Sequence, residues 1–360
     1  MSAAPTSLED LQHAVAASMP GPLRIVGAGT KAAPPAAGDA FVVDMRQLIG
    51  ITSYNPAECV LTALAGTPVA EIDAALAAHQ QYLPFDPTHM RAGGTIGGTV
   101  ASGLSGSGRY RYGGVRDFII GARVVDGRGR LIASGGQVVK NAAGFLTHHA
   151  LVGSAGRLGA IGEVTVKVFP RPEARATLRA GCASVDDAFA AHERLRAAAM
   201  DLEALDLEIA PDLRAATVVA RLAGAADALP TRVARAQVLL TTASHVLRHA
   251  DDARVWSDAA ECAWTSGATS LVKVPTAPTR VVAVTRALAP LGTCRVQCGG
   301  AVVLLATSQP LDAVHATLAG QGWRGVVVCG PAHGRLLGAA DSDAFAARVR
   351  LALDPDLRFR

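Results

Sequence analysis

The stretch "RAGGTIGGTVASGLSGSGRYRYGG", Arg91–Gly114, is the most unusual part of this sequence. Nine of its 24 residues are glycine, and it shows neither the alternation of a strand nor the period of a helix. Ordering so many glycines is costly, because glycine loses more backbone freedom on folding than any other residue. The stretch is therefore either a flexible linker or a loop whose ordering is offset by a bound ligand.

A shorter glycine turn, "VGAGTK" at Val26–Lys31, follows the apolar residues of a predicted strand. Backbone N–H groups in such a turn can converge on an anion without crowding from side chains. Thr30 adds a hydroxyl donor, and the longer stretch adds Thr95, Thr99 and Ser102. The two segments together predict a dinucleotide that is held mainly by backbone.

The two commonest nucleotide motifs are absent. "GAGTKAAPP" has a GxG, but the third glycine of GxGxxG is missing and two prolines would stop the following helix. No GxxxxGK[ST] sequence is present either. Taken alone, the short turn is better explained as an ordinary strand end, so the prediction depends on the longer stretch.

The composition limits the classes of function. The chain has 360 residues, about half of them hydrophobic, which is enough for two or three domains. Its 34 basic and 30 acidic residues give a net charge of +4, and no basic run is present. We therefore predict no binding of nucleic acid.

The sequence also gives expectations about location and metals. No run of about 20 apolar residues could span a bilayer, and the first residues do not form a signal peptide. Cys294 and Cys298 are four residues apart, but no histidine or second cysteine pair accompanies them. We expect buried free thiols, no metal site and a cytoplasmic chain.

Local signals predict the elements of the first half. A helix is expected over Leu8–Ala17 with Ser7 as its N-cap, and another after Thr67, with Thr67 as N-cap and Pro68 at its first position. Strands Ile119–Val125 and Leu131–Ala133 flank the turn "DGRG" and predict a hairpin.

The composition changes at "PRPEAR", residues 170–175, where glycine becomes less frequent. Ser184 is expected to cap a helix in the second half, with Asp187 completing the cap. Strands and helices then follow in an order that suggests one antiparallel sheet with helices on one face. The fold class is therefore α+β, with domains at residues 1–170 and 171–360.

Several motifs together carry a family resemblance. They are "VGAGTK", "PFDPTHMRAGGTIGGTVASGLSGSGRYRYGG", "VVKNAAGF" and "VGSAGRLGAIGEVTVKVFPRP". In order and spacing, residues from about 20 to 170 resemble the FAD-binding domain of the vanillyl-alcohol-oxidase/PCMH superfamily. "GGVRDFIIGAR" and the late "CGGAVVLL" make the chain most similar to the E subunits of bacterial glycolate oxidases. The resemblance implies a PCMH-type FAD-binding domain of two subdomains, followed by a reduced α+β cap domain.

The resemblance also implies which residues hold FAD. One group would hold the pyrophosphate from the first turn: Gly27, Ala28, Gly29, Thr30 and Lys31. A second group would enclose the pyrophosphate and ribityl chain: Pro87, Thr88, Gly93, Gly94, Thr95, Gly97, Gly98, Thr99 and Ser102. A third would border the adenine and ribose: Gly156, Gly159 and Ile161. Some relatives link FAD covalently through a histidine after the first turn or a cysteine in the second. Here the first turn is followed by Thr30–Lys31 and no cysteine lies between Cys59 and Cys182, which implies non-covalent FAD.

Catalytic residues are not evident. Related enzymes carry a late histidine-rich motif that deprotonates the substrate hydroxyl, whereas the corresponding "RVQCGGAVVLLAT" has no histidine. His148–His149 could lie near the flavin or be a surface or capping pair, and His89 could act near the flavin or only bond backbone. A cluster of arginines could attract an anion or be a solvated face: Arg109, Arg111 and Arg116. Lys140–Asn141 fall in a family motif and would order the loop around FAD.

The resemblance implies an FAD-dependent oxidoreductase acting on CH–OH groups, as one subunit of a glycolate oxidase. Glycolate or another D-2-hydroxy acid would become the 2-oxo acid, with electrons passing through flavin to an acceptor. The implied partners are a larger FAD-binding catalytic subunit and an iron–sulfur subunit, with membrane contact at the inner face only through these partners. Two alternatives remain: a stand-alone FAD-dependent dehydrogenase of 2-hydroxy acids or alcohols, and a non-catalytic scaffold that FAD stabilises.

Overall fold

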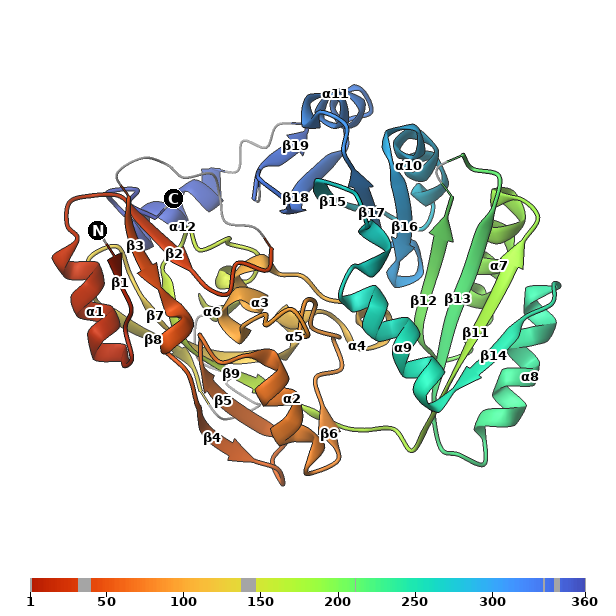
Figure 1. The fold of residues 1–360 in the computed structure, drawn as a ribbon, viewed down its shortest axis with the longest axis horizontal. Coiled ribbons are helices and arrows are strands. Elements are labelled where there is room, and N and C mark those ends of the chain that lie inside the picture. Colours follow the sequence, from red (N-terminus) through yellow and green to blue (C-terminus); the bar gives the residue numbers. More distant parts are fainter. Residues whose placement is uncertain are drawn as a thin grey trace. The chain divides into compact units, whose positions relative to one another are not determined.

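The computed structural model describes residues 2–31, 40–136, 147–210, 212–332, 334–339 and 344–359. The chain forms two compact units (Figure 1). The first comprises Met1–Ser105, Gly114–Arg171 and Asp341–Arg360, and the second comprises Gly106–Gly113 and Pro172–Ala340. One boundary at residue 170 does not describe these units, because two short segments are exchanged between them.

The first unit begins with a parallel three-stranded sheet in the order β1-β3-β2, formed by Ser2–Ala3, Phe41–Asp44 and Leu23–Val26. Helix α1, Leu8–Ala17, has the predicted bounds. Ser7 and Asp10 form a reciprocal capping box, in which the Ser7 hydroxyl accepts the Asp10 N–H at 3.0 Å. The predicted helix and its cap are confirmed.

A second sheet of the first unit is antiparallel and has five strands in the order β4-β5-β9-β7-β8. Its strands are Ile51–Asn55, Val60–Leu64, Ala160–Lys167, Ile119–Val125 and Leu131–Gly135. The predicted hairpin β7–β8 is confirmed. Its turn is fixed by the Asp126 carboxylate, which accepts the N–H groups of Arg128 and Arg130, each at 2.9 Å.

The remaining elements of this unit are short. They are η1 Met45–Gln47, α2 Val69–Ala77, β6 Gln81–Tyr82, α3 Ile96–Ser102, α5 Val115–Phe118, α6 Thr147–Leu151, β10 Phe169–Pro170 and α12 Ala344–Leu353. Thr67 is not the N-cap of α2, because that position is Pro68, which makes no side-chain cap. The Thr67 hydroxyl instead accepts the N–H of Gly50 at 2.9 Å and ties the helix start to the chain before β4.

The end of the chain is anchored in the first unit by one arginine. Arg358 is buried, and its guanidinium donates to the backbone carbonyls of Gly21, Gly127 and Val15 at 3.0, 2.6 and 3.1 Å. Its backbone carbonyl accepts the N–H of Leu23 at the start of β2. These bonds explain why a segment far along the sequence belongs to this unit.

The second unit contains one antiparallel sheet, as predicted. This sheet has nine strands in the order β14-β11-β13-β12-β16-β17-β15-β18-β19. In sequence order the strands are β11 Ala174–Cys182, β12 Leu202–Ile209, β13 Ala216–Gly224, β14 His245–Arg248, β15 Ser270–Pro275, β16 Thr293–Gln297, β17 Val302–Thr307, β18 Arg324–Cys329 and β19 Leu336–Gly338. The 3-10 turns η2 Ala263–Thr265, η3 Ala289–Leu291 and η4 Cys298–Gly300 lie between them.

Helices cover both faces of this sheet, so the expectation of one covered face is wrong (Figure 1). The main core lies under α7 Val185–Ala197, α8 Leu229–Leu240, α10 Val281–Leu288 and α11 Leu311–Gly320. Helix α9, His249–Ala260, lies on the other face, where Trp256 packs on Ala204 and Val219. Alternation along each strand gives both faces apolar residues, so the pattern alone could not place α9.

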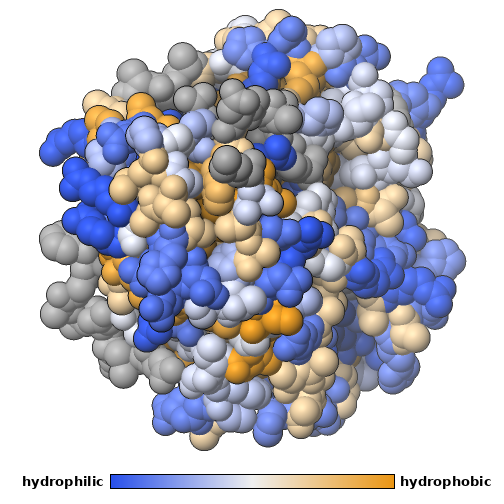
Figure 2. Space-filling model, turned by 60° about the vertical axis from the view of Figure 1, so that its left-hand side comes forward, coloured by the Kyte–Doolittle hydropathy of each residue, from blue (hydrophilic) through white to orange (hydrophobic). Residues whose placement is uncertain are grey.

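The predicted cap of α7 is confirmed, since the Ser184 hydroxyl accepts the Asp187 N–H at 3.0 Å. Short helix α4, Arg109–Tyr112, belongs to the second unit and packs on β12. Figure 2 shows mainly hydrophilic side chains on the face turned forward, with apolar ones in small groups. Among the residues that the structure describes, no helix is long and apolar enough to cross a membrane.

Candidate functional site

The structure brings the two glycine turns of the sequence together. A Cβ on Gly27, in the turn after β2, would lie 3.2 Å from the Thr95 hydroxyl. Thr95 is the N-cap of α3, and its hydroxyl accepts the N–H of Gly98 at 3.2 Å. The first turn therefore lies against the start of α3, although 67 residues separate Gly27 from Thr95 in the sequence.

The long glycine stretch is not entirely a loop. Residues Ile96–Ser102 form α3, which packs against β5 and β9, and Gly103 ends it with φ +61°. The expectation that this stretch has no helix is therefore wrong. The Thr95 cap and the burial of Ile96 and Val100 outweigh the low helix propensity of two glycines.

Six of the eight predicted glycines fall into two groups. At Gly29, Gly93 and Gly156 φ lies between +70° and +85°, and a Cβ would meet nothing within 4 Å. These three glycines have the left-handed backbone and border open space. A ligand could therefore approach their backbone closely.

Three other predicted glycines are required by packing. A Cβ on Gly97 would lie 2.7 Å from the Cβ of Ala65, and one on Gly159 would lie 2.7 Å from Val124 Cγ2. A Cβ on Gly94 would lie 2.7 Å from a backbone oxygen. Real Cβ atoms do not approach other atoms so closely. The glycine content of the stretch therefore has two physical causes that the sequence does not separate.

Two of the predicted hydroxyls are already used inside α3. The Thr99 hydroxyl donates to the Thr95 carbonyl at 3.0 Å, and the Ser102 hydroxyl donates to the Thr99 carbonyl at 3.1 Å. The other predicted residues differ in burial. Lys31, Thr88 and Ile161 are buried, Thr30, Pro87 and Gly98 are half-buried, and Ala28 is exposed.

Thr88 is the most informative of these residues. Its side chain is 5% exposed, and its hydroxyl oxygen has no hydrogen-bond partner among the residues that the structure describes. The buried hydroxyl of Ser154 is also unpartnered, in the segment that packs on α3 through the N–H of Gly153 and the Val100 carbonyl. Leaving a buried hydroxyl unsatisfied costs about 1–3 kcal/mol. Both atoms are therefore explained if a polar ligand completes the site.

The open glycines and the unpartnered hydroxyls together fit a long polar ligand such as FAD. The glycines let backbone N–H groups approach an anionic oxygen, and the hydroxyls supply single hydrogen bonds. The motif "VVKNAAGF" and its Lys140–Asn141 lie outside the described residues.

His148 does not lie on the surface, in contrast to one of the two interpretations of the His148–His149 pair. His148 is only 2% exposed, and its Nδ1 lies 3.0 Å from the Ser134 hydroxyl. Burial, with repulsion from His149, lowers the pKa of His148 to about 4. The two rings pack edge to face with centroids 4.6 Å apart, so they form a structural pair. His89 has φ +58°, and its carbonyl accepts the N–H of Gly94.

The arginine cluster of the sequence is divided between the units. Arg116 lies in the first unit, while Arg109 and Arg111 lie in the second. Arg111 forms an ion pair with Asp201 and donates to its carbonyl at 2.9 Å. The three arginines therefore do not belong to one compact unit.

Three of the five cysteines of the second unit are buried: Cys262, Cys294 and Cys298. None of the six cysteines of the chain forms a disulfide bond, and the burial of Cys294 and Cys298 is as predicted. Burial raises the pKa of the Cys294 thiol to about 12, which keeps it protonated at neutral pH. Within the described part of the chain, no three His, Cys, Asp or Glu side chains are arranged to hold a metal ion.

A buried histidine in the second unit gave no signal in the sequence. His192 of α7 is 3% exposed, its Nε2 has no partner, and burial lowers its pKa to about 4. Because this pKa lies below the ordinary value of 6.5, the unfolded chain takes up the proton first as the pH falls. The contribution of His192 to stability is therefore complete above pH 6.5 and lost towards pH 4.

We predict that the free energy of unfolding falls by up to about 1.4 kcal/mol per pH unit across that window because of His192. The His192→Leu variant should lose this part of the acid sensitivity, while His245→Leu, at an exposed histidine, should not. Urea unfolding at a series of pH values measures both. Equal pH dependence in wild type and His192→Leu would contradict the assignment.

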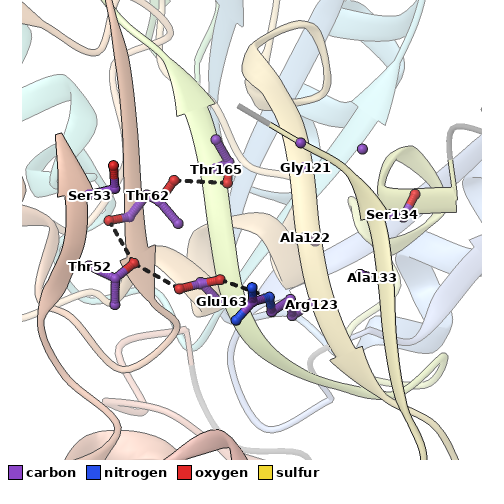
Figure 3. A pocket seen from close by; sticks show the side chains of 12 residues that line it. Thr52, Ser53, Thr62, Gly121, Ala122, Arg123, Ala133, Ser134, Glu163 and Thr165 are labelled. Carbon is purple, nitrogen blue, oxygen red and sulfur yellow. Dashed lines mark hydrogen bonds and ion pairs between the residues drawn. The ribbon is translucent and has the colours of Figure 1, made fainter. Parts of the chain in front are cut away.

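A separate polar hollow of about 430 Å³ lies on the five-stranded sheet (Figure 3). The Thr52 hydroxyl donates to Glu163 at 2.7 Å, and Glu163 pairs with Arg123 at 3.3 Å. The hydroxyls of Thr62 and Thr165 bond each other at 3.0 Å. These side chains satisfy one another, and none of the predicted FAD residues lines the hollow.

Comparison with known proteins identifies the glycine-rich part. Residues 1–135 match the family model "FAD binding domain". The chain is 42% identical over 174 residues to the glycolate oxidase subunit GlcE of Escherichia coli (strain K12), a match that covers 48% of this chain and 49% of GlcE. It is 35% identical over 146 residues to the glycolate oxidase subunit GlcD of Bacillus subtilis (strain 168), covering 40% of this chain and 30% of GlcD.

The matched stretches thus span half or less of these two relatives. A solved structure of alkyldihydroxyacetonephosphate synthase is similar over 99% of this chain and 75% of its own, with a TM-score of 0.74 and 14% identity. This similarity confirms the predicted α+β fold. Residues 1–135 therefore resemble an FAD binding domain, and FAD is the cofactor that this match indicates.

Proposed function

We propose that this chain is the FAD-binding subunit of a glycolate oxidase complex, in which glycolate or another D-2-hydroxy acid becomes the 2-oxo acid. The similarity to GlcE and GlcD supports this function. The observation that carries it is the meeting of the two glycine turns at Thr95, beside open glycines and an unsatisfied Thr88 hydroxyl. The first unit is then the FAD-binding domain, and the second is the cap.

The residues of the first unit would hold FAD without a covalent link. Gly27–Lys31 and Gly93–Thr95 would bind the pyrophosphate through backbone N–H groups, and Thr88 would give one hydrogen bond. Gly156, Gly159 and Ile161 would border the adenine and ribose. The chemistry that bound FAD would supply is the acceptance of a hydride from the hydroxyl-bearing carbon of the substrate. Acid precipitation should release all of the flavin into solution.

A base that takes the hydroxyl proton is needed for this step. The two most buried histidines of the described chain, His148 and His192, have a pKa of about 4, and His148 bonds Ser134. We therefore assign the base to a second, larger FAD-binding subunit, and place the iron–sulfur cluster in a third. The complex would be cytoplasmic, with membrane contact at the inner face through these partners.

The Thr88→Val variant tests the cofactor site. Valine has nearly the shape of threonine but no hydroxyl, so the unliganded protein should be as stable as wild type or more stable. Its affinity for FAD should fall about tenfold, because one hydrogen bond to the ligand is lost. Flavin fluorescence titration of the FAD-free protein gives the dissociation constant.

Thr285→Val is the matched control, since Thr285 is also buried with an unpartnered hydroxyl but lies in α10 of the second unit. It should leave FAD affinity unchanged. Equal affinities in wild type and Thr88→Val would remove Thr88 from the site, and a protein that takes up no added FAD would refute the proposed function.

Co-purification separates a subunit from the alternatives. A tagged chain expressed with its natural neighbours should bring down two partner chains. Bleaching of the flavin when a 2-hydroxy acid is added to the isolated chain would instead indicate a stand-alone dehydrogenase. If the complex keeps full activity when this FAD-loaded chain is left out, the chain is a scaffold.

A further inference from the structure

One face of the nine-stranded sheet carries a row of side chains whose charges do not balance. Residues directly opposite each other on neighbouring strands share a face of the sheet. The registers between β12, β16, β17, β15 and β18 therefore place five side chains side by side on one face, in this order: Glu208, Arg295, Leu304, Lys273 and Val326.

The arginine of this row is paired, whereas the lysine is not. Arg295 donates to Glu208 at 2.9 Å and to Asp206 at 3.1 Å. Lys273 has the apolar Leu304 and Val326 on either side. Within the described part of the chain it has no acidic partner. Burial, reinforced by the charge of Arg109 and opposed by Cys298, lowers the pKa of Lys273 to about 8.

Two further donors lie in this part of the unit, because α4 packs on β12 and on η4, the turn between β16 and β17. Arg109 of α4 is exposed, and in the described ranges it forms no ion pair. The Nη2 atom of Arg295 is buried and, within the described ranges, has no hydrogen-bond partner. Two cations near each other and a spare guanidinium donor would be stabilised by an anion, because an unpaired buried charge is costly.

We propose that Lys273 and Arg109 bind the carboxylate of a small organic acid on this face of the sheet. The positions of Lys273 and Arg109 define the site without reference to the proposed function. The choice of a 2-hydroxy acid such as glycolate as the ligand rests on the proposed function. Lys273 would supply a charge-assisted hydrogen bond from a partly desolvated position, and Arg109 a more solvated charge. Inorganic phosphate presents similar oxygens, so it serves as the comparison ligand.

Calorimetric titration of the FAD-loaded protein with sodium glycolate, at constant ionic strength, tests the site. Lys273→Met should weaken binding at least about tenfold, since a hydrogen bond to a charged group is lost. Lys273→Arg should restore most of the affinity. The matched control is Arg280→Met, which removes an exposed positive charge at the start of α10, on the other face of the sheet. Its affinity should equal that of wild type.

A second measurement does not depend on activity. Without ligand, Lys273→Met should unfold at a higher temperature than wild type, because the unpaired charge is gone. Saturating glycolate should raise the melting temperature of wild type but not that of Lys273→Met. The difference in melting temperature between the two proteins should therefore become smaller. A variant that is less stable than wild type without ligand would show that Lys273 has a structural partner, and would overturn the proposal.

The other outcomes are equally decisive. Glycolate binding of equal strength in wild type and Lys273→Met overturns the site. Equal binding of phosphate, chloride and glycolate overturns the assignment to a carboxylate. Flavin absorbance is recorded on every sample, so that loss of FAD, which would refute the proposed function, is distinguished from loss of the anion site.

Discussion

Arg295→Met should lower the free energy of unfolding by about 3–5 kcal/mol, because it leaves a carboxylate buried without its counter-charge. Asp206 is 0% exposed and Arg295 is 2% exposed. Asp206 accepts the Arg295 Nε–H at 3.1 Å and the Ser107 hydroxyl at 2.5 Å. Burial already raises the pKa of Asp206 against the opposing effect of Arg295, and loss of the arginine should raise it further. Urea unfolding measures the change.

Two variants accompany this measurement. Arg335→Met breaks the exposed pair with Asp312 and should change stability by no more than about 1 kcal/mol. Adding Asp206→Leu to Arg295→Met should recover most of the loss, since the unpaired charge is then absent. If Arg295→Met lowers the free energy of unfolding as little as Arg335→Met does, the buried pair of Arg295 and Asp206 does not hold Ser107 in the second unit. The segment Gly106–Gly113, which contains Ser107, is then not held by this pair either.

Gly97→Val should cost about 3 kcal/mol or more, as an overpacked contact that the backbone cannot relieve. The added Cβ would lie 2.7 Å from the Cβ of Ala65 and 2.8 Å from its carbonyl oxygen, which accepts the Gly97 N–H at 2.9 Å. Loss of FAD in this variant would follow from damage to α3. It would therefore not show that Gly97 contacts the cofactor.

Gly320→Ala is the control, because a Cβ at this helical glycine meets nothing within 4 Å and alanine favours the helix. It should be neutral or stabilising by up to about 1 kcal/mol. Thermal unfolding followed by circular dichroism compares the two variants. A Gly97→Val protein with a wild-type melting temperature would contradict the close packing of α3 on the chain after β5.

Features that depend on neighbouring residues could be predicted from the sequence. The capping box of α1 and the β7–β8 hairpin are formed by side chains within four residues of the backbone groups that they bind. The antiparallel sheet and the main core of the second unit follow from apolar alternation, which needs no knowledge of the partner strand. FAD was indicated by a glycine-rich stretch and its neighbouring motifs, whose order along the chain resembles that of a known family.

Other features were decided by contacts between distant residues. Gly29 and Gly97 are alike in the sequence, but one borders open space and the other touches Ala65. Arg358 anchors the chain end through carbonyls more than 200 residues away. Lys273 became a candidate only when the strand register placed it between apolar residues. A sequence specifies local backbone preferences, but burial and pairing depend on which distant segments pack together, and only the tertiary structure determines that.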